Sequence, residues 1–203
     1  MKKKFIFITI AAALILAAIT VTKIMNPLNL GISPLITANG QKPIGRSLEI
    51  SFSYENLALV ASNQYAFWIE DMDGKYVDTL YVTRYTAGEG HRRRPNSIPQ
   101  WVSAAGIADM RNSEIDAISG ATPKPGNYLV YWDFKDSKGN VVEGTEYRYF
   151  IEASVMNNDT AVYSGVIAIG EETWEDWPVP EYSNPNSEYN AMLSNVRVAY
   201  YPK

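Results

Sequence analysis

Apolar and polar residues alternate along several short stretches of the chain. In the clearest, residues 47–54 (SLEISFSY), every second residue is apolar: Leu48, Ile50, Phe52 and Tyr54. Side chains of a β-strand point alternately to its two faces, so this pattern predicts a strand with one face in a core and the other in water. Six more β-rich runs follow, at residues 65–70, 75–85, 127–134, 146–155, 162–169 and 195–201.

Turn signals separate these runs. The segment Asp71-Met72-Asp73-Gly74 joins two of them, and its last Asp-Gly pair supplies the positive φ of a tight hairpin turn. The same residues resemble part of a calcium loop, but the remaining ligands are missing, so a hairpin is favoured. About seven strands with one short helix predict an all-β fold, an immunoglobulin-like antiparallel β-sandwich.

Two segments interrupt the strands. Residues 86–124 are rich in Gly, Pro, Arg and Ser and are too long for a turn, so they are expected to form one long inserted loop region. Residues 171–190 are acidic and aromatic with prolines, which predicts an extended C-terminal segment over the sandwich in which prolines block strand addition. Function usually lies in loops held by a rigid scaffold, which makes the insertion the candidate region.

The chain begins with Lys2, Lys3 and Lys4, followed by an uncharged apolar stretch. This pattern predicts that residues 1–25 are a signal peptide or an N-terminal membrane anchor, because the apolar stretch is intermediate in length between the two. Residues 26–46 are then a linker and 47–203 a single sandwich domain. The domain is expected in the periplasm or on the extracellular face of the cytoplasmic membrane, touching membrane only through its N-terminal segment.

The amino-acid composition excludes several kinds of reactive site. The chain has no Cys, which excludes disulfides, thiolate zinc sites and iron–sulfur clusters, and its one His argues against a Ser-His-Asp hydrolase. Its formal net charge is −4, and the predicted signal contains lysines but no acid, so the exported part is more acidic still. This acidity argues against a nucleic-acid partner. Reactivity must therefore come from a tethered cofactor or a partner, which favours a carrier or a binding module over an enzyme.

Residues 125–153 (PGNYLVYWDFKDSKGNVVEGTEYRYFIEA) resemble the immunoglobulin-like module of flagellar hook-capping proteins. In that module a strand ending in Trp-Asp is followed by Asp, Gly, Val, Gly and an aromatic strand. The matching residues are Trp132, Asp133, Asp136, Gly139, Val142, Gly144, Tyr147 and Tyr149. The resemblance implies an immunoglobulin-like fold. The family has a short turn where this chain has residues 86–124, so the insertion stands out as an addition.

The exported region as a whole is similar to a family of bacterial periplasmic domains of unassigned function that accompany PepSY-type membrane reductases and flavin transferases. The likeness is carried by WIEDMDGKYVDTLYVTRY, HRRR, IPQW, DAISGATPKPG and NVRVAYYP. It implies an envelope redox context, with a membrane-bound reductase and a flavin transferase as partners.

Residues 116–122 (DAISGAT) have the form D-x-x-S-G-A-T. This motif resembles the flavinylation site of the FMN-bearing subunits of sodium-pumping quinone reductases, in which the last Thr is esterified by FMN phosphate. The resemblance implies that Thr122 is the attachment residue, that Gly120 and Ala121 keep the backbone slim, and that Asp116 and Ser119 are required flanks. The alternative is a structural turn in which a Ser or Thr hydroxyl caps the backbone.

Other residues of the insertion suit FMN. Arg92, Arg93 and Arg94 offer forked donors that match phosphate oxygens, and Trp101 could cover the isoalloxazine ring. The alternatives are a solvated patch that pairs with acids such as Glu89, and a tryptophan packed in the core under the loop.

Two functions remain open. The first is an exported, flavinylated electron carrier or accessory protein of an envelope redox system. The second is a non-enzymatic immunoglobulin-like binding module that contacts a membrane or envelope partner.

Overall fold

The computed structural model describes residues 36–57, 63–155 and 159–202, which belong to one compact unit, Leu35–Lys203. The predicted signal peptide or anchor, residues 1–25, lies outside the described residues, as does the first part of the predicted linker. Among the residues that are described, no helix is both long and apolar enough to span a membrane.

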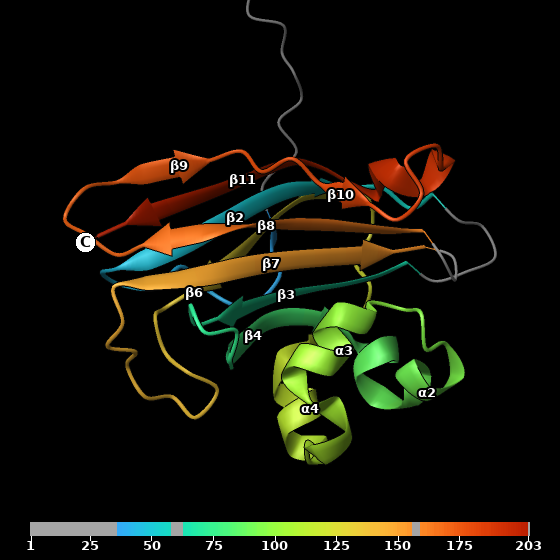
Figure 1. Ribbon diagram of the computed structural model, residues 1–203, viewed down its shortest axis with the longest axis horizontal. Helices are drawn as coiled ribbons and strands as arrows, with labels where there is room; N and C mark the ends of the chain where they lie inside the picture. The colour runs from blue at the N-terminus through green and yellow to red at the C-terminus, as the bar shows by residue number, and fades with distance from the viewer. Residues whose placement is uncertain (1–35, 58–62, 156–158, 203) are drawn as a thin grey trace, which may run out of the picture. The chain divides into compact units, whose positions relative to one another are not determined.

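Two β-sheets lie face to face (Figure 1). The first has the order β1-β6-β2-β11-β9, with bounds β1 Ile36–Thr37, β6 Gly126–Trp132, β2 Ser47–Tyr54, β11 Leu193–Tyr201 and β9 Trp174–Asp176. The second has the order β10-β8-β7-β3-β4-β5, with bounds β10 Glu181–Tyr182, β8 Thr160–Ala168, β7 Glu146–Ser154, β3 Gln64–Glu70, β4 Tyr76–Thr83 and β5 Ser119–Gly120. The predicted all-β sandwich is confirmed, and each of the predicted runs forms a strand. Its immunoglobulin-like character stays a prediction.

The long strands pair in antiparallel fashion, as predicted, but two short edge strands do not. Strand β1 pairs in parallel with β6, and β5 pairs in parallel with β4. A parallel pair cannot be joined by a tight turn and needs a long crossover. Residues 84–118 provide that crossover between β4 and β5.

The core between the sheets is largely aromatic. In β2 the alternate residues Leu48, Ile50, Phe52 and Tyr54 are buried, as the period of two predicts. Phe52 packs against Phe67 of the facing sheet, with ring centroids 4.9 Å apart. The chain has no Cys, so the two sheets are held together by this apolar packing and by hydrogen bonds such as that from the Tyr163 hydroxyl of β8 to the Leu193 carbonyl oxygen of β11.

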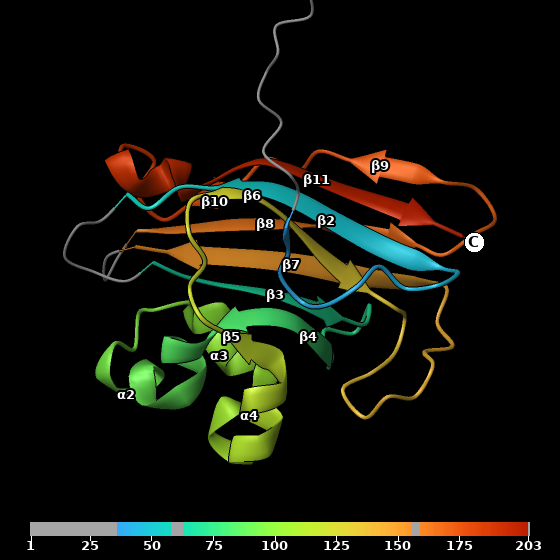
Figure 2. The same ribbon diagram turned by 180° about the vertical axis from the view of Figure 1, so that it is seen from behind.

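The insertion is helical, so its prediction as a loop region is wrong. It contains α2 His91–Arg93, α3 Pro99–Ala105 and α4 Asn112–Ile118, with short helical turns at Thr86–Gly90 and Ile107–Asp109. These helices lie beside β3 and β4 in Figure 2. Helices of at most seven residues show too little apolar periodicity to be recognised in a sequence, and packing stabilises them instead.

A second hydrophobic cluster joins the insertion to the outer face of the second sheet. Its members come from β3, β4 and the insertion: Ala66, Trp68, Val82, Ala87, Ile98, Trp101, Ala105 and Ile107. Strand β3 therefore packs on both faces, and its residues from Gln64 to Ile69 are all buried. Two-sided burial explains why YAFWIE is apolar at nearly every position instead of alternating.

The predicted hairpin between β3 and β4 is confirmed. The Asp71 carboxylate accepts the backbone N–H groups of Asp73 at 3.0 Å and Lys75 at 2.9 Å, and Gly74 has a φ of 82°. These bonds are those of a turn. No group of three or more side chains that could hold a metal ion occurs in the described parts of the chain.

The segment 171–190 adds strands at the edges of both sheets. Strand β9 pairs with β11 and β10 pairs with β8, so the prediction that prolines block strand addition is wrong. The reason is positional, because Pro178 and Pro180 lie between the two strands, where no ladder hydrogen bond is needed.

The end of the predicted linker also belongs to a sheet. After β1, the side-chain amide of Asn39 accepts the Tyr131 N–H at 2.9 Å and donates to the Tyr131 carbonyl oxygen at 2.6 Å. The amide thereby pairs with β6 much as a further strand residue would.

Candidate functional site

The D-x-x-S-G-A-T motif spans the end of a helix and the start of a connection. Asp116 lies in the last turn of α4, and Ser119 and Gly120 form β5, opposite Val82 and Thr83 of β4. The next two residues, Ala121 and Thr122, are exposed in the connection to β6.

Gly120 is required by a close approach of Tyr81. A Cβ atom at position 120 would lie 2.6 Å from Cε2 and 2.8 Å from the hydroxyl oxygen of Tyr81, well inside normal contact. The same hydroxyl donates a 2.7 Å hydrogen bond to the Ala121 carbonyl oxygen. The small residue therefore lets Tyr81 bind the backbone just before Thr122.

The two hydroxyls of the motif make little use of their hydrogen-bonding capacity. The Ser119 hydroxyl oxygen is buried and has no hydrogen-bond partner among the described residues. Thr122 is exposed, and its hydroxyl makes one long contact of 3.5 Å with the Asn63 carbonyl oxygen. A long bond of this kind is weak, so the Thr122 hydroxyl remains accessible.

The three arginines of the HRRR run do not act as one cluster. Arg94 turns inward, where its guanidinium donates to the Val155 carbonyl oxygen at 3.1 Å and lies 5.8 Å from the centre of the Tyr85 ring. Arg92 and Arg93 are exposed on α2. Arg94 therefore ties the insertion to the end of β7, while its two neighbours face solvent.

Trp101 is fully buried in the second hydrophobic cluster. Its indole Nε1–H donates to the Thr79 hydroxyl at 2.9 Å, and its backbone N–H donates to the Glu152 carboxylate at 2.9 Å. This is the placement expected of a tryptophan packed under the insertion. No face of its ring is open to a cofactor in this structure.

Glu152, which sequence reasoning missed, is buried beneath α3. Its carboxylate accepts the first N–H groups of that helix, from Gln100 at 3.3 Å and Trp101 at 2.9 Å. Burial raises the pKa of Glu152 to about 7, and these two hydrogen bonds limit the rise. Glu152 alternates with apolar residues in the run EYRYFIEASV, so the sequence pattern assigns it to the solvent face.

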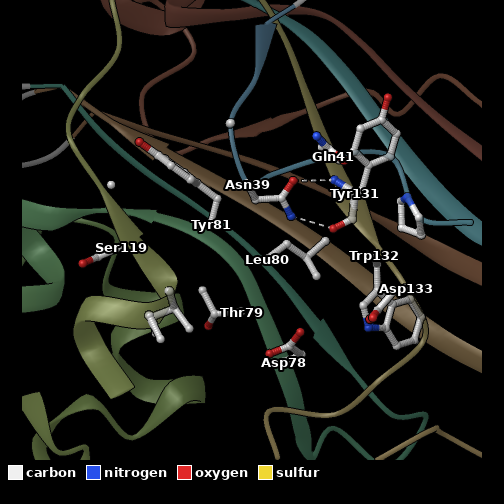
Figure 3. A pocket seen from close by; sticks show the side chains of 15 residues that line it. Asn39, Gln41, Asp78, Thr79, Leu80, Tyr81, Ser119, Tyr131, Trp132 and Asp133 are labelled. Atoms are coloured by element: carbon white, nitrogen blue, oxygen red, sulfur yellow. Dashed lines mark hydrogen bonds between the residues drawn. The ribbon is translucent and has the colours of Figure 1, made fainter. Parts of the chain in front are cut away.

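One cavity, of about 370 Å³, opens beside the motif between the edges of the two sheets (Figure 3). We call it the carboxylate pocket; its lining includes Asp78, Asp133, Asn39, Tyr81 and residues 117–120. Burial raises the pKa of Asp78 to about 7, and the negative charges of Asp133 and Asp136 add to the rise. Sequence reasoning missed Asp78 because its position in an ordinary strand run gave no sign of burial.

A second cavity, of about 480 Å³, lies on the helical side of the motif. We call it the arginine pocket; its lining includes Arg84, His91, Arg92 and Asp116, with apolar residues from the helical turns. Arg84 and Asp116 form a 2.8 Å ion pair in which both side chains are exposed. Of the predicted site residues, Arg92 and Asp116 both line this pocket, Ser119 and Gly120 line the carboxylate pocket, and Ala121 and Thr122 line neither. Arg93, Arg94 and Trp101 line neither cavity.

Residues 47–177 match the family model of predicted periplasmic proteins named DUF2271. The matched range includes β2, the helical insertion, the complete motif and β9. Neither the search of curated proteins nor that of solved structures returned a match. Because the model covers well over half of the chain, the protein belongs to the DUF2271 family of predicted periplasmic proteins.

Proposed function

We propose that this protein is an exported carrier of covalently bound FMN in an envelope redox system, with the flavin phosphate esterified to Thr122. The observation that carries the proposal is the placement of this hydroxyl. Thr122 is exposed and weakly bonded, and it follows backbone that β4 and Tyr81 hold in place. A modifying enzyme needs such an accessible hydroxyl on an extended, well-positioned segment.

The residues around the motif fit a flavin phosphate. The Ser119 hydroxyl is a buried polar group without a partner three positions before Thr122, and Arg84 and Arg92 lie at the neighbouring cavity. Attachment requires a flavin dinucleotide as donor. The Thr122 oxygen bonds to phosphorus, the phosphoanhydride bond breaks, the nucleoside monophosphate leaves, and the hydroxyl proton passes to a base of the transferase.

The bound group would supply the electron transfer. The protein's part is to hold the flavin outside the cytoplasm, where a dissociating cofactor would be lost. A membrane-bound reductase is the proposed electron donor, and the periplasm or the outer side of the cytoplasmic membrane is the proposed location.

Intact mass spectrometry tests this function. The full chain is co-expressed with a flavin transferase, and we expect a mass increment equal to one esterified FMN. Thr122→Ala should lose the increment. Thr145→Ala removes another exposed threonine and should keep it. Absence of the increment in the unsubstituted protein, or its presence in Thr122→Ala, contradicts the proposal.

The exposure of Arg92 and Arg93 favours a second candidate, a binding module for an acidic envelope partner. In the described residues neither side chain forms an ion pair closer than 4.0 Å. The test is co-purification after Arg92→Ala with Arg93→Ala, leaving Arg94 in place because it holds the Val155 carbonyl. Loss of one defined partner from protein that never contains flavin would favour this function over the first.

A further inference from the structure

The arginine pocket includes the first residue of the motif, Asp116, in its lining, whereas Thr122 does not line it. Strand β5 pairs in parallel with β4, and Gly120 is opposite Thr83. Ala121 follows Gly120, and Arg84 follows Thr83. Arg84 therefore leaves the sheet beside Ala121, the residue that precedes Thr122. Arg84 lines the pocket, as does Asp116 at the start of the motif.

The pocket has an apolar side and a polar side. The apolar lining residues are Ile107, Ala108, Met110 and Ile115, and the polar ones include Arg84, His91, Arg92 and Asn112. Its volume of about 480 Å³ lies within the range of small-molecule sites. An isoalloxazine ring has two flat faces that require apolar contact and one edge of carbonyl oxygens and ring nitrogens that requires polar partners.

The two ring nitrogens of His91 differ in their hydrogen bonding. Its Nδ1 lies 3.1 Å from the Thr86 carbonyl oxygen, which can only accept, so Nδ1 carries the hydrogen of that bond. In the neutral ring, Nε2 is then an acceptor. This Nε2 atom is buried and has no hydrogen-bond partner in the described structure.

Arg92 and Arg84 differ in their availability. The Arg84 guanidinium is bonded to Asp116, which also belongs to the motif. Arg92 lies in α2, one residue after His91, and makes no ion pair with any described residue. Arg92 therefore shares the pocket with the Glu89 carboxylate without forming an ion pair with it among the described residues.

We propose that the arginine pocket binds the isoalloxazine ring of the flavin carried on Thr122, with the apolar residues against its face and Arg92 at its polar edge. This inference rests on the proposed function. A reduced flavin carries more negative charge than an oxidised one, so the Arg92 cation stabilises the reduced form and raises the midpoint potential.

The first experiment uses protein produced without a flavin transferase and free riboflavin, which has no phosphate and cannot form the Thr122 ester. We expect saturable quenching of riboflavin fluorescence. Ala108→Phe, which places a ring in the arginine pocket, should abolish it. Ala117→Phe is the matched control, because Ala117 is also exposed but lines the carboxylate pocket.

The second experiment uses the loaded protein. Arg92→Gln should lower the midpoint potential of the bound flavin and raise the riboflavin dissociation constant of the unloaded protein about tenfold, the usual loss for a charge-assisted hydrogen bond. Arg93→Gln, an exposed neighbour that does not line the pocket, should change neither.

The outcomes separate the two proposals. If loaded protein forms but Ala108→Phe and Arg92→Gln leave its potential and the exposure of its flavin to iodide unchanged, the pocket assignment is overturned and the flavinylation stands. If no FMN attaches, the proposed function fails, and the riboflavin titration alone decides the pocket: no saturable quenching, or equal quenching with Ala108→Phe, overturns it.

Discussion

The Tyr81 hydroxyl donates a hydrogen bond of 2.7 Å to the Ala121 carbonyl oxygen, immediately before Thr122. Tyr81 is a residue of β4, whereas Ala121 lies beyond the entire helical insertion. One phenol therefore connects the sandwich to the segment that carries the candidate attachment residue, and the ring that reaches it requires a glycine at position 120.

We expect Tyr81→Phe to loosen this segment without unfolding the domain. The change removes one hydrogen bond and keeps the ring, so the free energy of unfolding should fall by about 1 kcal/mol. Hydrogen exchange should speed up at residues 119–122 and remain as in the unsubstituted protein in β7. Uniformly faster exchange would show that Tyr81 acts through global stability instead.

Gly120→Ala should destabilise the domain by about 1–3 kcal/mol, because the new methyl group overlaps the Tyr81 ring and forces it to move. Chemical denaturation measures the loss. Gly126→Ala is the matched control, since a Cβ there meets Tyr128 at an ordinary 3.6 Å. Equal losses in the two variants would mean that the contact with Tyr81 is not the cause.

Asp78→Asn should stabilise the protein at alkaline pH. The pKa of Asp78 is raised from 3.8 to about 7, so the folded state keeps a proton that the unfolded state releases. The resulting stability is complete below the unfolded pKa and is lost as the pH rises through about 7. At pH 8 the variant avoids the cost of a buried charge, and a gain of roughly 2 kcal/mol is expected.

Urea titrations at pH 5 and pH 8 measure this gain. Asp133→Asn, an exposed carboxylate at the rim of the same pocket, serves as control and should give a smaller change. If the free energy of unfolding of Asp78→Asn changes between pH 5 and pH 8 as it does in the unsubstituted protein, the prediction is wrong.

The stability of the protein should also depend less on pH in Glu152→Gln than in the unsubstituted protein. Burial raises the Glu152 pKa from 4.5 to about 7, so between these values folding retains a proton on Glu152, and stability falls as the pH rises. The variant has no proton to lose, and its stability should change less between pH 5 and pH 8. Glu146→Gln, at the exposed start of the same strand, should keep the original slope.

The sequence predicts the sandwich well because one-sided burial leaves a period of two, as in β2. It predicts the covered face of the second sheet poorly, since alternation along β7 assigns Phe150 and Glu152 to solvent. The insertion buries Glu152 instead and packs Phe150 against its cluster. Nothing local to residues 146–155 encodes that cover, which comes from helices more than forty positions earlier.

The candidate site, too, can be predicted only in part from the sequence. The motif is contiguous, so its residues could be named from the sequence, and the structure adds the exposure of Thr122 and the reason for Gly120. The two cavities depend on contacts between distant segments. Asp78 faces a pocket shared by both sheets, and Arg92 and Asp116 line one pocket because β5 returns to the edge of β4. The spacing of these residues along the chain does not predict either pocket.

The outermost strands of both sheets, β1, β9, β10 and β5, are only two or three residues long. Long open strand edges are templates on which a second chain can add by backbone pairing, and short ones offer little to extend. Asn39 further occupies the backbone of Tyr131 next to β1. Each outer strand thus blocks two or three positions of the longer strand beside it from pairing with a second chain.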